Sequence, residues 1–206
     1  MRKTGILMPV SSLPSRTGVG EMGAEAYHFL TLLKESGIKI WQILPMNPVG
    51  YGNSPYQPYS SCAGDELYIS LDMLYEEGLL KERPEGFHEY ATKVDYDAVR
   101  LHKEPYLREA FQTFLTSGGC ETKDYQEFAD QSWVYEYGAF RALKKANGGC
   151  CWNEWKQEDK MWPDARTDLA PELETEVQYH MFLQYVFFSQ WMKLKEKANA
   201  YDIQIM

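Results

Sequence analysis

Two short apolar runs, at residues 5–10 and 38–45, flank a segment whose apolar residues recur at helical spacing. In that segment, residues 24–36, one helix face carries Ala26, Phe29, Leu30 and Leu33. Gly37 follows and is suited to end the helix. A strand, a crossover helix and a second strand predict a βαβ unit with parallel pairing and a right-handed connection. We therefore expect an α/β protein.

Helical patterns dominate the rest of the chain. We expect helices at 101–115 and 125–146, and a long helix from about Asp168 to residue 200, with Pro171 in its first turn. The apolar residues that follow, Ile203, Ile205 and Met206, predict the start of a third strand.

These patterns divide the chain into three parts. Residues 1–71 hold the first strands and a long loop, residues 72–168 form a mostly helical insertion, and residues 169–206 hold the long helix and the start of the third strand. A third parallel strand without a further neighbour leaves an unpaired edge. We therefore expect the chain to be a portion of a longer protein.

Residues 41–61 are the most informative about function. Trp41 to Leu44 predict a buried strand that Pro45 and Pro48 stop. The large side chains of the loop that follows are aromatic or neutral polar, among them Tyr51, Tyr56 and Tyr59. Such a loop offers flat apolar faces and uncharged hydrogen-bonding groups, which suit a neutral ligand with many hydroxyls. The alternative is an ordinary packed loop in which the tyrosines fill the core.

The charge of the chain argues against two classes of partner. Lys and Arg number 21 against 30 Asp and Glu, so the formal net charge is −9. Because no basic stripe is available, nucleic acid and anionic membrane surfaces are disfavoured. The N-terminal apolar run is too short for a signal peptide or a membrane span.

The cysteines and histidines predict neither disulfides nor metal binding. Cys62, Cys120, Cys150 and Cys151 contain no Cys-x-x-Cys spacing, and the adjacent pair lacks the separation of an ordinary disulfide. The four histidines are scattered without the spacing of a metal site. We expect reduced thiols, a cytoplasmic location, and no metal or cofactor.

Several motifs together resemble a known family. Gly-Ile-Leu-Met-Pro-Val-Ser-Ser-Leu-Pro-Ser-Arg-Thr-Gly-Val-Gly-Glu-Met-Gly (5–23) resembles the opening of the amylomaltases, the 4-α-glucanotransferases of glycoside hydrolase family 77. Trp-Gln-Ile-Leu-Pro (41–45), Gly-Tyr-Gly-Asn-Ser-Pro-Tyr-Gln (50–57) and Ala-Gly-Asp-Glu-Leu-Tyr-Ile-Ser-Leu-Asp (63–72) are similar to their second signature. The chain departs at two positions: Asn53 stands where the family usually has Asp, and Asp65 where it usually has Asn.

The resemblance implies both a fold and a reaction. The fold is the N-terminal part of a (β/α)₈ TIM barrel, with about three parallel strands and a mostly helical insertion; a complete barrel takes roughly 250 residues. The reaction is the retaining transfer of α-1,4-glucan segments, which needs two carboxyl groups about 5–5.5 Å apart. After the first two strands, the next carboxylates are Glu21 and Asp65, both distant from the strand tips. We therefore assign no catalytic residue, and expect the catalytic carboxylates in the missing C-terminal part of the barrel.

The resemblance also implies substrate-binding residues for a maltooligosaccharide. Tyr56 matches the tyrosine whose ring lies against the glucose at the cleavage point, and Ser54 matches the serine beside it. Tyr51 matches a tyrosine at a more distant glucan-binding groove. Trp152 and Trp155 are either further stacking platforms or apolar anchors of the insertion.

Two other functions remain open from the sequence. One is a non-catalytic carbohydrate-binding module, which would bind glucans without transferring them. The other is a helical interaction protein with a vestigial sheet, which would form a stable oligomer and have no glucan affinity.

Overall fold

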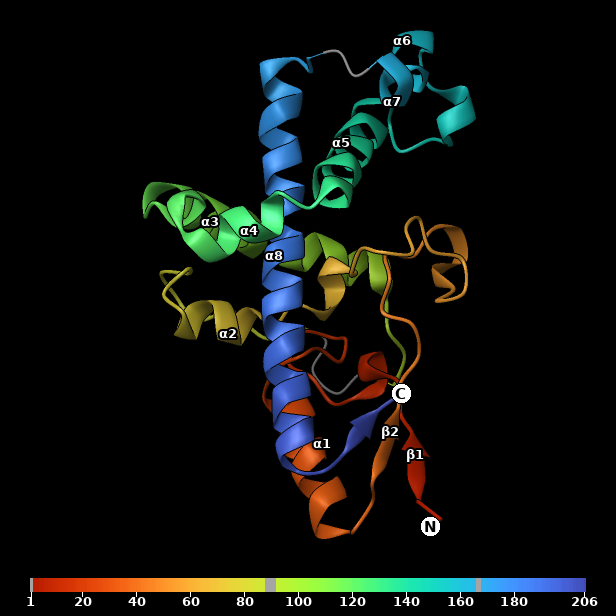
Figure 1. The fold of residues 1–206 in the computed structure, drawn as a ribbon, viewed down its shortest axis with the longest axis vertical. Coiled ribbons are helices and arrows are strands. Elements are labelled where there is room, and N and C mark those ends of the chain that lie inside the picture. The colour runs from red at the N-terminus through yellow and green to blue at the C-terminus, as the bar shows by residue number, and fades with distance from the viewer. Residues whose placement is uncertain (1, 88–91, 166–167) are drawn as a thin grey trace. The chain divides into compact units, whose positions relative to one another are not determined.

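The computed structural model describes residues 2–87, 92–165 and 168–206, apart from the side chains of Tyr51 and Ala165 (Figure 1). These residues belong to two compact units. The sheet unit comprises Met1–Ser117 and Val186–Met206, and the helical unit comprises Gly118–Tyr185. The three parts predicted from sequence patterns, with boundaries at residues 71 and 168, are not the same as these compact units, and they stay a prediction.

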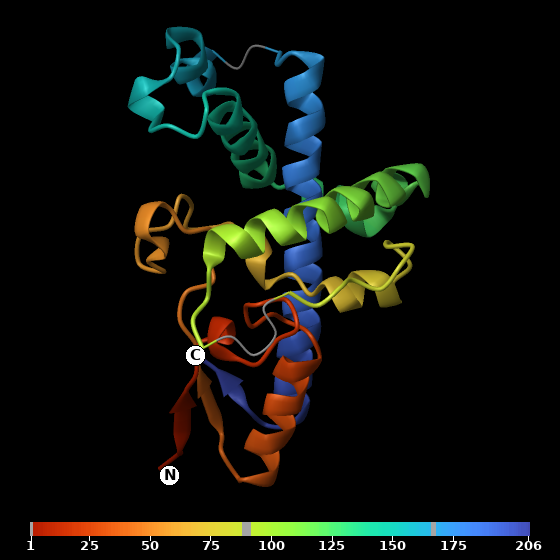
Figure 2. The same cartoon turned by 180° about the vertical axis from the view of Figure 1, so that it is seen from behind.

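Three parallel strands form the sheet in the order β1 (Gly5–Leu7), β2 (Ile40–Gln42) and β3 (Gln204–Ile205). Ile6 pairs with Trp41, and Trp41 with Ile205. Figure 2 shows the three strands side by side. The predicted parallel strands are confirmed, but each is shorter than its apolar run. The run of the first strand ends early because Val10–Ser12 already form a 3-10 turn, η1.

Helix α1 (Ala24–Glu35) is the crossover between β1 and β2. The ring of Phe29 in this helix packs edge to face against the indole of Trp41, with ring centroids 5.0 Å apart. Trp41 is fully buried, and its Nε1 donates a hydrogen bond to the carbonyl of Met8 at 2.8 Å. One side chain of β2 thus holds the crossover helix and the chain that leaves β1.

The remaining helices of the sheet unit are α2 (Leu71–Glu76), α3 (Tyr96–Thr116) and the last part of α8 (Pro171–Ala200). Helix α3 begins before the predicted residue 101, because the carboxylate of Asp95 accepts a hydrogen bond from the Ala98 amide. In α8, the amide side chain of Gln190 exchanges two hydrogen bonds with the backbone of Ser70, at 2.7 and 3.1 Å. This contact fixes the start of α2 against α8.

The helical unit contains α4 (Lys123–Ala129), α5 (Ser132–Ala146), α6 (Gln157–Lys160), α7 (Trp162–Ala165) and the first part of α8. The single helix predicted at 125–146 is wrong in one respect: Gln131 has an extended backbone and separates α4 from α5. The long helix begins at Pro171 rather than at Asp168. A buried cluster holds this unit together, comprising Ala139, Ala142, Leu143, Trp155, Trp162 and Val177.

Short 3-10 turns connect these elements. They are η1 (Val10–Ser12), η2 (Tyr51–Asn53), η3 (Glu66–Tyr68), η4 (Gly119–Glu121) and η5 (Trp152–Glu154). No helix in the described ranges combines the length and hydropathy that crossing a membrane requires.

Two adjacent leucines of α1 test the packing on the sheet. Leu33 is 2% exposed and Leu32 is 45% exposed. We expect Leu33→Ala to lower the free energy of unfolding by about 2–5 kcal/mol, because it leaves a cavity in the core. Leu32→Ala should change it by less than about 1 kcal/mol. Urea unfolding followed by circular dichroism measures both, and equal effects would contradict the packing described.

Candidate functional site

A pocket of about 230 Å³ lies where the carboxyl ends of β1 and β2 meet the loops that follow them. Ser11 and Ser12 enter it after β1, and Leu44 enters it after β2. Loop residues Asn53 and Pro55 form another wall. We call it the strand-end pocket. Ligands of parallel α/β sheets bind at this end of the strands, so its position marks it as the candidate site.

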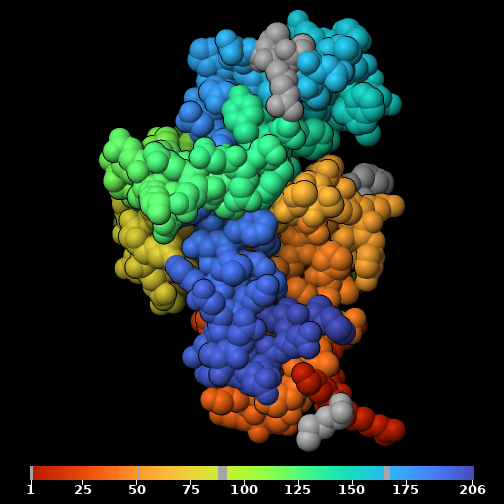
Figure 3. All heavy atoms as spheres, viewed as in Figure 1, coloured from red at the N-terminus to blue at the C-terminus, as the bar shows by residue number. Residues whose placement is uncertain are grey.

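The tyrosine loop, residues 48–59, doubles back on itself beside this pocket. Val49 and Pro58 form an antiparallel bridge, and the Tyr59 amide donates to the Pro48 carbonyl at 2.9 Å. At the tip, Gly52 has φ 80° and Asn53 has φ 51°. Glycine and asparagine are the residues that adopt this left-handed conformation most easily. The loop is therefore closed on itself by backbone hydrogen bonds. Figure 3 shows that it forms part of the molecular surface.

The predicted sugar-binding residues all lie in the tyrosine loop. Tyr56 is 71% exposed, so it does not fill the core. Ser54 is half-buried, and its Oγ accepts a hydrogen bond from the Tyr56 amide at 3.4 Å. Tyr51 begins η2, and its side chain lies outside the described part of the structure. That these three residues contact sugar stays a prediction.

Loop residues other than the predicted sugar-binding ones line the strand-end pocket. Asn53 and Pro55 appear in its described lining, whereas Ser54 and Tyr56 do not. Ser54 and Tyr56 therefore contact each other but do not line the pocket. A ligand that touched both the pocket and Tyr56 would have to extend outward over the loop.

Asp65 lies in the wall of the pocket and anchors the tyrosine loop. Its side chain is 2% exposed and accepts two hydrogen bonds from the Arg100 guanidinium, at 2.8 and 3.1 Å. It also accepts one from the Leu67 amide at 3.0 Å and one from the Val49 amide at 3.4 Å. One carboxylate thus connects the base of the loop, η3 and helix α3.

The electrostatics of this anchor come from burial and two neighbours. Burial raises the pKa of the Asp65 carboxyl, the adjacent Glu66 carboxylate raises it further, and Arg100 opposes both effects. Arg100 also donates to Glu66 at 3.2 Å, so one guanidinium serves two carboxylates. Burial likewise raises the pKa of the nearby Tyr68 phenol, which stays protonated as a hydrogen-bonding group.

A second buried ion pair supports the other side of the pocket. Lys103 of α3 is 1% exposed, and its Nζ donates to Glu21 at 2.9 Å and to the carbonyls of Leu67 and Ile69 at 2.8 and 2.6 Å. The hydroxyl of Thr17 donates to the same Glu21 carboxylate at 2.9 Å. Helix α3 therefore fastens the loop after β1 and the segment around η3 with two cations, Arg100 and Lys103.

Sequence reasoning missed this pair of cations. A lone Arg and a lone Lys on a helix look like solvated charges, and their spacing of three residues carries no motif. For Asp65, the sequence indicates a departure from the family and a carboxylate distant from the strand tip, but not its partner Arg100. Within the described residues, no group of three or more His, Cys, Asp or Glu is placed to hold a metal.

Comparison with known proteins identifies the family. Residues 8–206 match the family described as 4-alpha-glucanotransferase. The chain belongs to this 4-α-glucanotransferase family. It is 40% identical to the 4-alpha-glucanotransferase of Thermus thermophilus, covering 100% of this chain and 41% of that protein. It is also 40% identical to the enzyme of Synechocystis, covering 99% of this chain and 42% of that protein. The chain thus spans about two fifths of the length of these curated relatives.

Solved structures agree with this assignment to the 4-α-glucanotransferases. The amylomaltase from Streptococcus agalactiae in complex with acarbose superposes with a TM-score of 0.88 at 32% identity, covering 100% of this chain and 42% of that one. The amylomaltase from Corynebacterium glutamicum, at 15% identity and a TM-score of 0.71, shows likeness of fold. The predicted family and the predicted portion of its barrel fold are confirmed.

The Asp65 anchor predicts a large effect of one substitution. We expect Asp65→Ala to lower the free energy of unfolding by about 3–5 kcal/mol, because Arg100 loses its more buried partner and keeps only Glu66. The substitution also removes the acceptor of the Leu67 and Val49 amides. The control is Glu104→Ala, which breaks an exposed pair with Arg108 within α3 and should cost less than about 1 kcal/mol. Chemical denaturation compares the two variants, and a cost at Asp65 no larger than at Glu104 would refute the anchoring role.

Proposed function

We propose that this chain is part of a cytoplasmic 4-α-glucanotransferase that moves α-1,4-glucan segments from one maltodextrin to another. The observation that carries the proposal is the strand-end pocket beside the tyrosine loop, which displays Tyr56 to solvent. Family membership supports the activity, and the related amylomaltase was solved in complex with acarbose. The cysteines, none of which forms a disulfide, are compatible with a reducing compartment.

In this proposal the tyrosine loop positions the donor sugar. The Tyr56 ring lies against the glucose at the cleavage point and Ser54 faces its hydroxyls, while Tyr51 serves a more distant glucan groove. An aromatic ring that stands free of the core can offer its apolar face to the C–H face of a sugar. Because backbone bonds and Asp65 already fix the loop, little ordering entropy is lost when substrate arrives.

The proposed reaction is a double displacement with retention. One carboxylate attacks the anomeric carbon, and a second protonates the leaving sugar and then activates the acceptor hydroxyl. The carboxylates around the strand-end pocket already form ion pairs. Asp65 and Glu66 pair with Arg100, and Glu21 pairs with Lys103. We therefore propose that these three carboxylates support the wall of the cleft, and that both reacting carboxylates lie outside these 206 residues.

Tyr56 provides the direct test of the loop. In the enzyme that includes the remaining barrel strands, we expect Tyr56→Ala to lower the rate of maltotriose disproportionation by about ten- to hundredfold, because the sugar is held less accurately. Tyr56→Phe should keep most of the activity, since it keeps the ring. Tyr75→Ala removes another partly exposed tyrosine, on α2, and should leave the rate unchanged. Wild-type turnover in Tyr56→Ala would exclude the role.

The location of the reacting carboxylates is tested with the chain itself. We expect residues 1–206 alone to form neither glucose nor longer maltodextrins from maltotriose, because the wall of the cleft lacks the reacting groups. The longer gene product should form both. Disproportionation by the 206-residue chain would disprove the assignment. Glucan binding without transfer by the longer product would favour a carbohydrate-binding module instead.

A further inference from the structure

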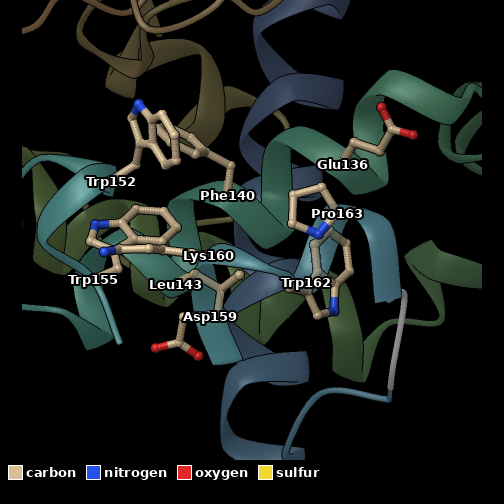
Figure 4. Close-up of a pocket in the computed structure, with 9 residues that line it drawn as sticks. All are labelled: Glu136, Phe140, Leu143, Trp152, Trp155, Asp159, Lys160, Trp162 and Pro163. Carbon is tan, nitrogen blue, oxygen red and sulfur yellow. The ribbon is translucent and has the colours of Figure 1, made fainter. Parts of the chain in front are cut away.

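The helical unit holds a second pocket, distant in sequence from the tyrosine loop. Its volume is about 370 Å³, within the range of small-ligand sites. We call it the aromatic pocket, and its apolar wall consists of Phe140, Leu143, Trp152, Trp155, Trp162 and Pro163. Figure 4 shows these side chains gathered from α5, from η5 and Trp155 just after it, and from α7. All of them belong to the helical unit, so the pocket is built within one compact body.

Two of the three indoles are fixed parts of the wall. Trp155 is 6% exposed, its Nε1 donates to the Cys150 carbonyl at 3.2 Å, and its ring centroid lies 5.6 Å from that of Phe140. Trp162 is 9% exposed and lies near the ring of Tyr135. Of the two roles left open for Trp155, these contacts favour the apolar anchor, and they hold both rings in the wall of the pocket.

Trp152 differs sharply from these two residues. It is 64% exposed, although it lies only three residues before the buried Trp155. Because η5 ends at Glu154 and Trp155 has an extended backbone, the two indoles separate into an exposed and a buried position. An indole left in water at the mouth of an apolar pocket marks a surface suited to a ligand.

The charged groups around the pocket select against ionic ligands. Lys160 contributes a half-buried cation, and Glu136 and Asp159 contribute carboxylates. In Figure 4 both carboxylates point away from the indoles. Asp159 accepts a hydrogen bond from the Asn147 side chain at 2.7 Å. Because the carboxylates point away and the wall is otherwise mostly apolar, a neutral ligand with an apolar face fits best.

We propose that the aromatic pocket binds a segment of α-1,4-glucan, with Trp152 stacking on a glucose ring. The choice of a glucan rests on the proposed function, because the same enzyme would encounter long glucan chains as donor and acceptor. The pocket shares no residue with the strand-end pocket or the tyrosine loop. It therefore holds a polymeric substrate at a second point and raises the local concentration of chain ends.

The site can be observed directly by fluorine NMR. The chain has six tryptophans, so the 206-residue protein labelled with 5-fluorotryptophan gives few resonances, and the loss of one in Trp152→Phe assigns Trp152. We expect maltoheptaose to shift the Trp152 resonance in a saturable way, while cellohexaose, a β-1,4 glucan, does not shift it. Trp152→Ala should weaken maltoheptaose binding at this pocket by about threefold to tenfold.

Controls separate this inference from the proposed function. Trp133→Phe removes an indole of the helical unit outside the pocket lining and should not change the affinity. An unmoved Trp152 resonance at millimolar maltoheptaose, or a response only to an apolar dye, would overturn the inference. The longer enzyme is assayed in parallel with maltotriose. Activity without the shift leaves the proposed function standing, and the shift without activity leaves the glucan site standing.

Discussion

The burial of Trp41 is the constraint on which the sheet unit depends. Its ring contacts Phe29 of α1, and its nitrogen bonds to the chain just after β1. Its backbone pairs with both neighbouring strands. The tips of β1 and β2 are therefore fixed relative to each other and to the crossover helix. Ser11, Ser12 and Leu44 of the strand-end pocket lie on the segments that leave those two tips.

Helix α3 provides a second level of support, through charge. Arg100 bonds to the buried carboxylate of Asp65, and Lys103 bonds to Glu21 and to the carbonyls of Leu67 and Ile69. A buried ion pair contributes little net stability compared with apolar packing, but it tolerates few alternative geometries. The pairs at Asp65 and Glu21 thus favour one arrangement of the loops, which is what a binding surface requires.

The sequence predicted the elements with a repeating pattern more successfully than those held by isolated contacts. The βαβ unit follows from apolar periodicity, and the tyrosine loop from proline, glycine and aromatic residues. The break at Gln131 was missed because apolar residues continue at helical spacing through it. The Asp65–Arg100 pair joins positions far apart in the chain, and no single-sequence pattern reports such a contact. Trp152 is exposed and Trp155 is buried because η5 ends between them. The end of a short turn is the least predictable property of an element.

The sheet itself has a practical consequence. β1 and β3 each have one neighbour within the described residues, whereas every strand of a closed barrel has two. Their outer backbone groups are open to pairing with another extended segment. At high concentration, two copies of this chain would be able to join edge to edge, so dilute samples and charged solubilising tags are the sensible conditions for handling it.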